Sequence, residues 1–292
     1  MTDTWTVGRL LGWTTDYLNQ HGAESARLDA ELLLGRARKC SRIELYTAWD
    51  EQVDDDVRTE FRELVKRRAA GTPVAYLLGF REFFSLRFRV TPDVLIPRPE
   101  TEHLVVALLE LARGRTAGAQ PVRVVDVGTG SGVIAICAAK HLPGCMVTAV
   151  DTSAAALAVA EDNARRLGVH ESITFVQSDL LEAVTDPDSF DFVVSNPPYV
   201  GRDEVDELAT EVRDHEPRAA LIGGERGSEL IARLVPQACR RLCPGGHFLC
   251  EIAPRLDAEV RQLVSAQADF EVQPTIKDLA GLPRVVRARR RG

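Results

Sequence analysis

The chain has 292 residues, and 45% of them are hydrophobic, which is enough for two cores, one of catalytic size and one small. Its net charge of −7 argues against a protein whose affinity comes mainly from nucleic-acid phosphates. The six cysteines form no Cys-x-x-Cys pair and the histidines form no cluster with them, so we expect reduced thiols and no metal site. The N-terminus has no signal pattern and no apolar run is long enough to span a bilayer, so we expect a cytoplasmic protein.

The N-terminal part of the chain, from about residue 4 to residue 70, has the periodicity of helices. Apolar residues recur at helical spacing in the first of them: Leu10, Leu11, Trp13, Tyr17 and Leu18. Ser25 and Ser41 are expected helix caps, and the acidic turn at residues 54–56 opens a further helix that runs to Ala70. All three tryptophans lie in this part, as in the core of a small bundle. The pattern predicts a helical domain over residues 1–75.

A β-hairpin linker is expected next, over residues 76–101. Apolar and polar residues alternate between residues 78 and 92, so that Phe84, Leu86, Phe88 and Val90 share one face. From about Glu102 onward, helices and apolar strands alternate, as they do in a doubly wound α/β sheet. We therefore place a second domain, of α/β class, at residues 102–292.

The first strand of that domain runs into a glycine-rich turn. Residues 124–127 are apolar apart from Asp126, and an apolar helix begins at Val133. Between them, glycines alternate with other residues: Gly128, Thr129, Gly130, Ser131 and Gly132. Glycine lets the backbone N–H groups approach a cofactor, because no Cβ stands in the way. A dinucleotide fingerprint would have its third glycine one place later, where this chain has Val133.

Polar residues also follow the next two strands. The strand at residues 145–150 ends in Asp151, and a carboxylate about 20 residues past the glycine turn can accept hydrogen bonds from both ribose hydroxyls of an adenosine. The strand at residues 173–177 leads to Asp179 and Leu180, which would hold an adenine. Either aspartate alone could be a helix cap or a solvated turn. Three successive strand ends with such features favour an adenosine-containing cofactor.

A fourth strand, at residues 190–194, precedes Ser195 and then Asn196, Pro197, Pro198 and Tyr199. The prolines fix φ and remove backbone N–H groups, so the loop is stiff. The Asn196 side-chain oxygen and a nearby carbonyl can accept the two hydrogens of a planar NH2 group, while the Tyr199 ring covers its face. Asn-Pro is also an ordinary turn signal. Together with the glycine turn, the motif indicates chemistry on an amide or on an exocyclic base amine.

These motifs, in this order, resemble a class I S-adenosylmethionine-dependent amino-methyltransferase. Residues 73–79 and the segment Ile-Pro-Arg-Pro-Glu-Thr-Glu at residues 96–102 are similar to the linker of the HemK/PrmC family, the N5-glutamine methyltransferases of peptide chain release factors. Residues 216–221, 242–246 and 278–284 also fit that family. One departure is visible at Ala253 and Leu256, where the family commonly has Gly and Gln.

The resemblance implies a Rossmann-like sheet, S-adenosylmethionine as cofactor, and methylation of the glutamine in a Gly-Gly-Gln motif of release factors by a monomeric enzyme. The implied catalytic residues are Asn196, Pro197 and Tyr199, with Asn196 also near the cofactor. Pro198, Arg98 and Phe88 would join them in binding the substrate. Residues 1–75 would dock the release factor. His215 and Glu216 receive no role in proton transfer.

Three other functions are consistent with parts of the sequence. A DNA adenine-N6 methyltransferase would use the same tetrapeptide on a flipped base, but it would need a basic recognition region, which this acidic chain lacks. A methyltransferase of glutamine in a ribosomal protein would have the same amide-binding loop. An interaction protein with a decayed cofactor fold is disfavoured, because the motif positions hold competent residues.

Overall fold

The computed structural model describes residues 5–114 and 121–292. The first four residues, at the N-terminus where no signal pattern is expected, lie outside the described part. The chain forms two compact units. One, called here the helical unit, comprises the chain up to Phe80 together with Ala209–His215. The other, the sheet unit, comprises Arg81–Leu208 and Glu216–Gly292. Among the described helices, none has the length and apolar character that a bilayer crossing requires.

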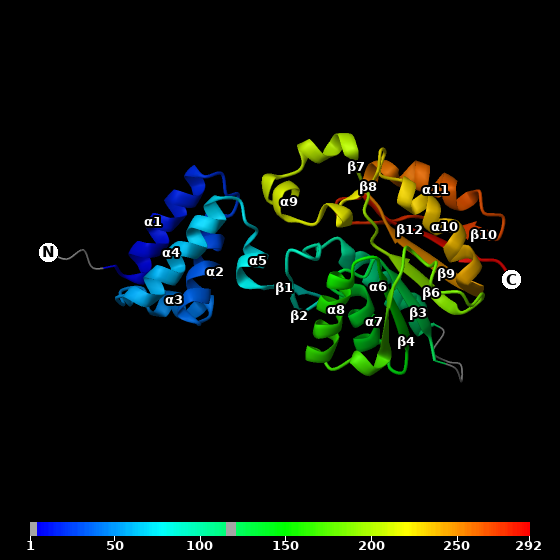
Figure 1. The fold of residues 1–292 in the computed structure, drawn as a ribbon, viewed down its shortest axis with the longest axis horizontal. Helices are drawn as coiled ribbons and strands as arrows, with labels where there is room; N and C mark the ends of the chain where they lie inside the picture. The colour runs from blue at the N-terminus through cyan, green and yellow to red at the C-terminus, as the bar shows by residue number, and fades with distance from the viewer. Residues whose placement is uncertain (1–4, 115–120) are drawn as a thin grey trace. The chain divides into compact units, whose positions relative to one another are not determined.

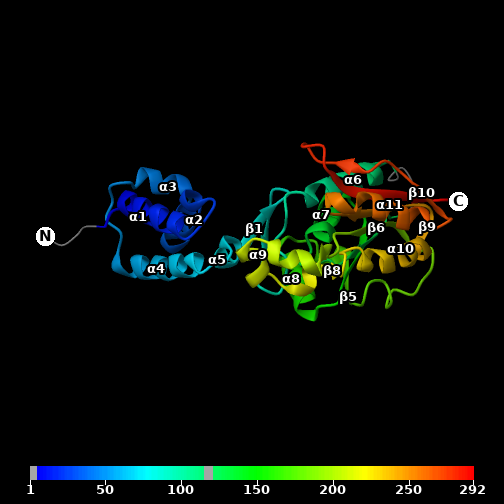
Figure 2. The ribbon, with the colours of Figure 1, turned by 90° about the horizontal axis from the view of Figure 1, so that it is seen from above.

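The helical unit is a small bundle whose main helices lie side by side (Figure 2). Its helices are α1 (Val7–Gln20), α2 (Ala26–Arg38), α3 (Arg42–Thr47), α4 (Asp55–Ala69), α5 (Val74–Leu78) and α9 (Thr210–His215). The expected cap of α3 is confirmed: the Ser41 hydroxyl accepts from the Glu44 N–H, and the Glu44 carboxylate accepts from the Ser41 N–H. Ser25 precedes α2 as expected but makes no side-chain capping bond.

Two elements of the helical unit differ from the sequence-based expectation. Helix α5 lies across the expected boundary with the linker, between Pro73 and the left-handed Gly79. Helix α9 comes from a distant part of the chain, and an ion pair with the largely buried Arg68 holds it in the helical unit. The Arg68 guanidinium pairs with Asp29 at 2.7 Å and with Glu211 of α9 at 2.6 Å. A buried guanidinium needs such partners, because its desolvation is otherwise uncompensated.

The sheet unit has the α/β architecture expected from the sequence. Its strands are β1 (Phe80–Phe83), β2 (Leu86–Arg89), β3 (Arg123–Val127), β4 (Met146–Asp151), β5 (Ile173–Gln177), β6 (Phe190–Ser195), β7 (Val200–Gly201), β8 (Ile222–Gly224), β9 (Leu242–Glu251), β10 (Phe270–Val272), β11 (Ile276–Lys277) and β12 (Pro283–Arg290). Its α-helices are α6 (Thr101–Arg113), α7 (Val133–His141), α8 (Ala154–Arg166), α10 (Glu229–Arg241) and α11 (Asp257–Ser265). Short 3-10 turns lie at His170–Ser172, Arg202–Glu207, Arg218–Ala220 and Pro254–Leu256.

The central sheet has the order β10-β12-β9-β6-β3-β4-β5, with β11 paired to β12. Strands β5, β4, β3, β6 and β9 are parallel neighbours, whereas β12 pairs antiparallel with β9 on one side and with β10 on the other. Helices cover both faces, as Figure 1 shows for α6 and α7 on one side of the sheet and α10 and α11 on the other. Parallel strands therefore end together at one edge of the sheet.

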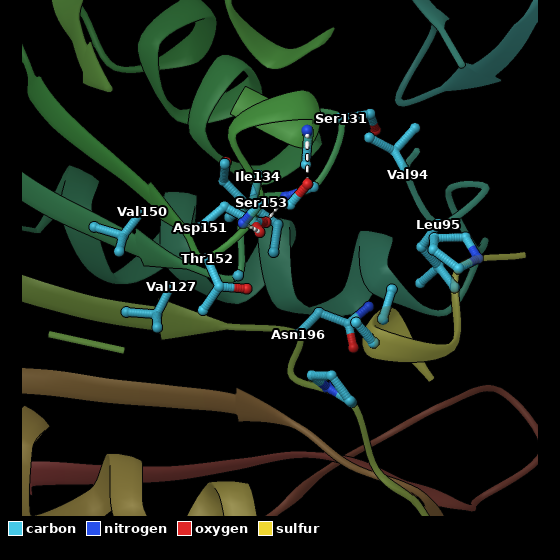
Figure 3. Close-up of a pocket in the computed structure, with 18 of the residues that line it drawn as sticks. Val94, Leu95, Val127, Ser131, Ile134, Val150, Asp151, Thr152, Ser153 and Asn196 are labelled. Atoms are coloured by element: carbon cyan, nitrogen blue, oxygen red, sulfur yellow. Dashed lines mark hydrogen bonds between the residues drawn. The ribbon is translucent and has the colours of Figure 1, made fainter. Parts of the chain in front are cut away.

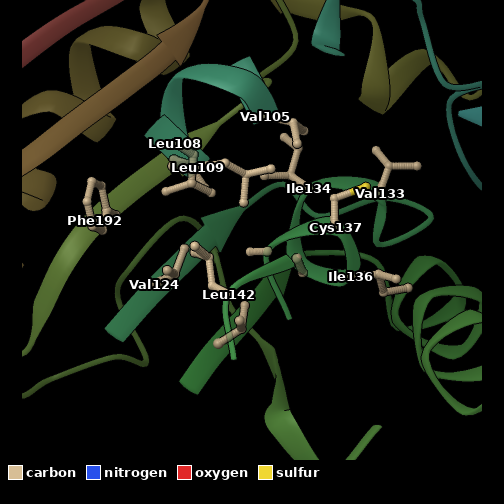
Figure 4. Close-up of a cluster of buried hydrophobic side chains, with 14 of the residues drawn as sticks. Val105, Leu108, Leu109, Val124, Val133, Ile134, Ile136, Cys137, Leu142 and Phe192 are labelled. Carbon is tan, nitrogen blue, oxygen red and sulfur yellow. The ribbon is translucent and has the colours of Figure 1, made fainter. Parts of the chain in front are cut away.

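Alternate residues of each central strand enter opposite cores. On β3, Val124 packs under α6 and α7 in one core, and Val125 packs under α10 and α11 in the other. Figure 4 shows the first core, which contains Val124 together with Leu108 of α6, Ile134 of α7 and Phe192 of β6. Burial on both faces fixes the strand register, because a slip of one residue would exchange the two faces.

The hairpin β1–β2 forms, but its turn differs from expectation. Phe84, expected on the shared apolar face, lies in the two-residue turn with Ser85, and both have positive φ (50° and 58°). Such a turn matches the twist of the flanking strands, although Asn-Gly is its usual sequence. The structure also groups this hairpin with the sheet unit from Arg81 onward, not with a separate linker.

Asn163 of α8 connects this hairpin to the glycine-rich turn. Its side-chain oxygen accepts from the Arg89 N–H at 2.7 Å, and its side-chain nitrogen donates to the carbonyls of Arg89 (3.0 Å) and Ser131 (2.9 Å). Asn163 is 1% exposed, so water does not offer these groups alternative partners. One amide thus ties the end of β2 to the loop after β3.

We predict that Asn163→Asp lowers the stability of the sheet unit by about 2–4 kcal/mol, because the carbonyls of Arg89 and Ser131 lose their donor inside the protein. Urea denaturation followed by circular dichroism measures the change. The matched control is Asp162→Asn on the same helix, which weakens only partly exposed ion pairs with Arg89 and Arg166 and should cost less than about 1 kcal/mol. Equal midpoints for Asn163→Asp and the unchanged protein would contradict the role given to Asn163.

Candidate active site

A cavity lies within the sheet unit at the edge where the parallel strands end, which is the usual ligand position in open α/β sheets. Figure 3 shows Asp151 and Asn196 on the walls of this same cavity. The lining includes most of the residues expected to bind the cofactor: Gly128, Thr129, Gly130, Ser131, Asp151, Asp179, Leu180 and Asn196. Arg98 and Pro198 line it as well. The structure thus brings the glycine turn, the strand-end acids and the Asn-Pro-Pro-Tyr loop together.

The glycine turn is held from below by Asp126. One carboxylate oxygen of this fully buried residue accepts from the Thr129 hydroxyl (2.7 Å) and from the Ala135 N–H (3.1 Å). The other oxygen finds no partner among the described residues. Burial raises the pKa of Asp126 to about 7, against the opposing effect of these two hydrogen bonds. Asp126 therefore shapes the turn and does not face the cavity.

Gly132, expected to bind the cofactor, does not line the cavity. Its φ is +84°, and a Cβ here would lie 3.1 Å from the Ala160 Cβ. Gly132 thus suits the turn, where the positive φ would strain another residue, and allows the turn to pack closely on α8.

Asp151 organises two segments while it lines the cavity. One of its carboxylate oxygens accepts from the Gly130 N–H and the other from the Ser153 N–H, both at 2.9 Å. Each oxygen retains lone pairs for further donors. The next strand end places Asp179 in the lining, where its carboxylate pairs with Arg233 at 2.6 Å. Leu180 follows with a positive φ of 50°.

Some residues of the Asn-Pro-Pro-Tyr loop line the cavity, and others are turned into the protein. The half-buried Asn196 lines the cavity, and its side-chain nitrogen donates to the Thr101 hydroxyl oxygen at 3.0 Å. Pro198 also lines the cavity, whereas Pro197 is buried and Tyr199 packs against the core under α10 and α11. Burial raises the pKa of the Tyr199 phenol to about 12, so this group stays neutral near pH 7.

A glycine-rich segment supports this loop from behind. A Cβ at Gly223 would collide with the Pro198 carbonyl, and one at Gly227 would collide with the Tyr199 carbonyl. Arg255 also donates to the Tyr199 carbonyl at 3.1 Å. These close backbone contacts leave the loop little freedom to move.

The segment before α6 reaches the cavity through Leu95 and Arg98, and the first residue of α6, Thr101, lines the cavity as well. Glu216 fixes that segment: its buried carboxylate accepts from the Ile96 N–H at 3.1 Å and from the Arg98 guanidinium at 2.5 Å. Glu216 is therefore a structural anchor, in agreement with its having no proton-transfer role.

Phe88 differs from the expectation that it binds the substrate. Its side chain is 0% exposed and meets Phe83 edge-on in the core under α6 and α7. A ring without exposed surface cannot contact a substrate, so we leave Phe88 out of the site. The alternation that identified the hairpin face was itself the signal for this burial.

Sequence reasoning missed some lining residues. Ser153 lines the cavity and also caps α8, so its helix-capping pattern was visible in the sequence. Thr101 belongs to the segment at residues 96–102 that carried the family resemblance, and Leu95 directly precedes it, but no chemistry pointed to either residue individually. Their place depends on how α6 packs on the sheet.

Comparisons with known proteins agree with this geometry. Residues 9–79 match the family model described as "PrmC N-terminal domain", and residues 115–224 match "Methyltransferase small domain". A release factor glutamine methyltransferase of Rhodopirellula baltica is 47% identical over 282 residues, covering 97% of this chain and 95% of that protein. One of Koribacter versatilis is 45% identical over 274 residues, covering 94% of this chain and 95% of that protein.

Among solved structures, a ribosomal protein L11 methylase from Lactobacillus delbrueckii subsp. bulgaricus is similar, with 25% identity and a TM-score of 0.50. The match covers 73% of this chain and 90% of that chain. It agrees with the methyltransferase fold seen in the sheet unit. With the two full-length relatives, these findings show that the chain belongs to the HemK/PrmC family of release factor glutamine methyltransferases, which are S-adenosylmethionine-dependent enzymes.

Proposed function

We propose that this chain transfers a methyl group from S-adenosylmethionine to the side-chain amide nitrogen of the glutamine in the Gly-Gly-Gln motif of peptide chain release factors. The observation that carries the proposal is that the amide-binding residue Asn196 and the cofactor-binding turn at Gly128 line one cavity. The two strand ends that bear them are adjacent, because β3 and β6 pair in parallel up to Val127 and Ser195.

The residues of the cavity fit the cofactor. Asp151 has lone pairs for two ribose hydroxyls, and its position is fixed by two backbone N–H groups. Asp179 and Leu180 would flank the adenine, and Gly128 lets the backbone approach the rest of the molecule. When bound, S-adenosylmethionine supplies the electrophilic methyl group.

The protein's task is to orient a poor nucleophile. An amide nitrogen shares its lone pair with its carbonyl group, and it attacks only when held in line and close to the methyl carbon. The Asn196 side-chain oxygen and the Pro197 carbonyl accept the two amide hydrogens, which favours a pyramidal nitrogen as positive charge develops. Tyr199 contributes its ring and not a base, since its phenol is neutral near pH 7 and burial raises its pKa further. No general base is needed, since an N-protonated amide is itself strongly acidic and loses its proton readily.

We further propose that the helical unit docks the body of the release factor, and that the enzyme works as a monomer in the cytoplasm without binding nucleic acid directly. Exposed large apolar side chains support a docking role: Trp13, Ile43, Tyr46 and Trp49. Isolated exposed apolar residues are common, but three of these follow one another closely on and after α3.

Removal of the Asp151 carboxylate should weaken cofactor binding at least tenfold, because ribose hydrogen bonds of about 0.5–3 kcal/mol are lost. Isothermal titration calorimetry of Asp151→Ala with S-adenosylmethionine measures the effect. The control is Asp162→Asn, which changes a partly exposed acid outside the cavity lining. An unchanged dissociation constant in Asp151→Ala would refute the assignment of this carboxylate.

The acceptor is tested by mass spectrometry of a release factor incubated with the enzyme and S-adenosylmethionine. We expect one added methyl group on the glutamine of Gly-Gly-Gln. With Asn196→Ala, methylation should fall below detection while the cofactor affinity, measured by calorimetry, stays within about threefold, because Asn196 acts mainly on the amide. Near-normal turnover by Asn196→Ala would disprove the role of Asn196.

For docking, Ile43→Ser is the sharpest variant, since Ile43 is 78% exposed and its loss should not disturb the fold. We expect the KM for the intact release factor to rise about fivefold or more, the effect of losing ~1 kcal/mol of interface contact. The KM for a short Gly-Gly-Gln peptide should stay unchanged. Val106→Ser, an exposed position of α6, serves as control. Equal KM values of Ile43→Ser and the unchanged enzyme for the intact factor would place docking elsewhere.

A further inference from the structure

A chain of buried polar groups leads from Asn196 into the sheet. The Asn196 side-chain nitrogen donates to the Thr101 hydroxyl oxygen at 3.0 Å, and the Thr101 hydroxyl is in turn hydrogen-bonded to the Glu251 carboxyl group. Thr101 is the first residue of α6, and Glu251 is the last residue of β9. Both are 1% exposed. Beyond the cavity itself, this chain of polar groups therefore has no contact with bulk water.

The strand register of the sheet places Asn196 and Glu251 beside each other. Strands β6 and β9 are parallel and pair Ser195 with Cys250, so Asn196 and Glu251 each follow directly after a paired residue. On its other side, β9 pairs Glu251 with Val285 of β12. The Glu251 carboxyl group thus stands at the strand end beside the amide-binding loop, in the interior of the sheet.

Hydrogen-bond counting then decides which way the Asn196 amide points. The oxygen and nitrogen of an asparagine amide have the same shape, so only the partners can distinguish them. A threonine hydroxyl has one hydrogen. The Thr101 hydroxyl donates that hydrogen to Glu251, because its contact lowers the pKa of the carboxyl group. Thr101 can then only accept from Asn196, and the nitrogen of Asn196 faces Thr101 at 3.0 Å. The Asn196 oxygen is then left for the cavity.

We infer that Thr101 and Glu251 are positioning residues, which hold the Asn196 amide with its oxygen toward the substrate. The inference rests on the proposed function, in which that oxygen accepts a hydrogen of the glutamine amide. In the reversed orientation the Asn196 nitrogen would face the NH2 group of the substrate, donor against donor. The network thus selects the amide orientation before the substrate binds.

The free oxygen of Glu251 agrees with this role. Within the described residues, its Oε2 atom has no hydrogen-bond partner, so the contact with Thr101 falls to the other oxygen. Burial raises the pKa of Glu251 to about 7. Burying a carboxyl group costs free energy of folding. A role of Glu251 at the site therefore explains its presence better than a contribution to stability alone does.

The test is the pair Thr101→Val, which removes the hydroxyl at constant shape, and Thr101→Ser, which keeps it. With a Gly-Gly-Gln peptide as substrate, Thr101→Val should lower kcat by about ten- to a hundredfold, the range that one lost buried hydrogen bond can produce. Its affinity for S-adenosylmethionine should stay within about threefold, since Asn196 and not the cofactor is affected. Thr101→Ser should restore most of the lost activity.

A matched control and a double variant separate positioning from a general structural effect. Thr14→Val makes the same replacement at a buried hydroxyl of α1 that has no partner in the described part of the chain, and it should leave kcat unchanged. Glu251→Leu should lower kcat by itself but add little to Thr101→Val, because both changes break one chain of bonds. Melting temperatures confirm that each variant is folded.

Nuclear magnetic resonance gives a readout that does not depend on activity. In protein labelled with ¹⁵N-asparagine, the side-chain NH2 signal of Asn196 is the one lost in Asn196→Ala. One of its protons should exchange slowly in the unchanged enzyme and rapidly in Thr101→Val. Fast exchange in both, a kcat of Thr101→Val within twofold of the unchanged enzyme, or a parallel loss of cofactor affinity would each overturn the inference. Absence of methylation by the unchanged enzyme would instead refute the proposed function.

Discussion

The register of the parallel strands is the constraint on which the rest of the structure depends. Strand β3 pairs Val127 with Val150 of β4 and with Ser195 of β6, so Gly128, Asp151 and Asn196 all emerge at one edge of the sheet. Burial of both faces holds this register, because each strand sends alternate side chains into two separate cores. A slip of one residue would bury the wrong side chains and separate these groups.

Buried polar groups within the sheet unit then hold these strand ends and their loops in a fixed arrangement. Asn163 binds the hairpin to the glycine turn, Asp126 supports that turn from below, and Glu216 holds the segment that carries Arg98. Each of these side chains is buried and hydrogen-bonds backbone, hydroxyl or cationic groups. Buried hydrogen bonds rigidify a site, and a rigid site is what the orientation of an amide nucleophile requires.

Much of this arrangement could be predicted from the sequence, because the relevant signals are local. The glycine turn, Asp151, Asp179 and the Asn-Pro-Pro-Tyr loop each stand directly after an apolar strand, and parallel strands bring such positions together. The bundle helices were visible from periodicity and from the Ser41 cap. Gly132 shows the limit of this reasoning, since it belongs to the motif but serves packing on α8.

The features that sequence reasoning missed depend on contacts between distant segments. The alternation of the hairpin marked the face that carries Phe88, but its complete burial arises only when the hairpin packs on the core of the sheet unit. Arg68 and Glu211 are 143 positions apart, and nothing in either segment indicates their ion pair. The contact of Thr101 with Asn196 likewise arises only when α6 packs at the strand end, 95 positions away in sequence.

The central claim is that one cavity presents cofactor and acceptor amide to each other. A crystal structure of the protein with S-adenosylhomocysteine and a glutamine-containing peptide tests it most directly. The account predicts the ribose at Asp151, and the glutamine amide nitrogen within hydrogen-bond distance of the Asn196 oxygen and the Pro197 carbonyl, facing the sulfur atom. A ribose bound away from Asp151, or a glutamine side chain that contacts neither Asn196 nor Pro197, would contradict the account.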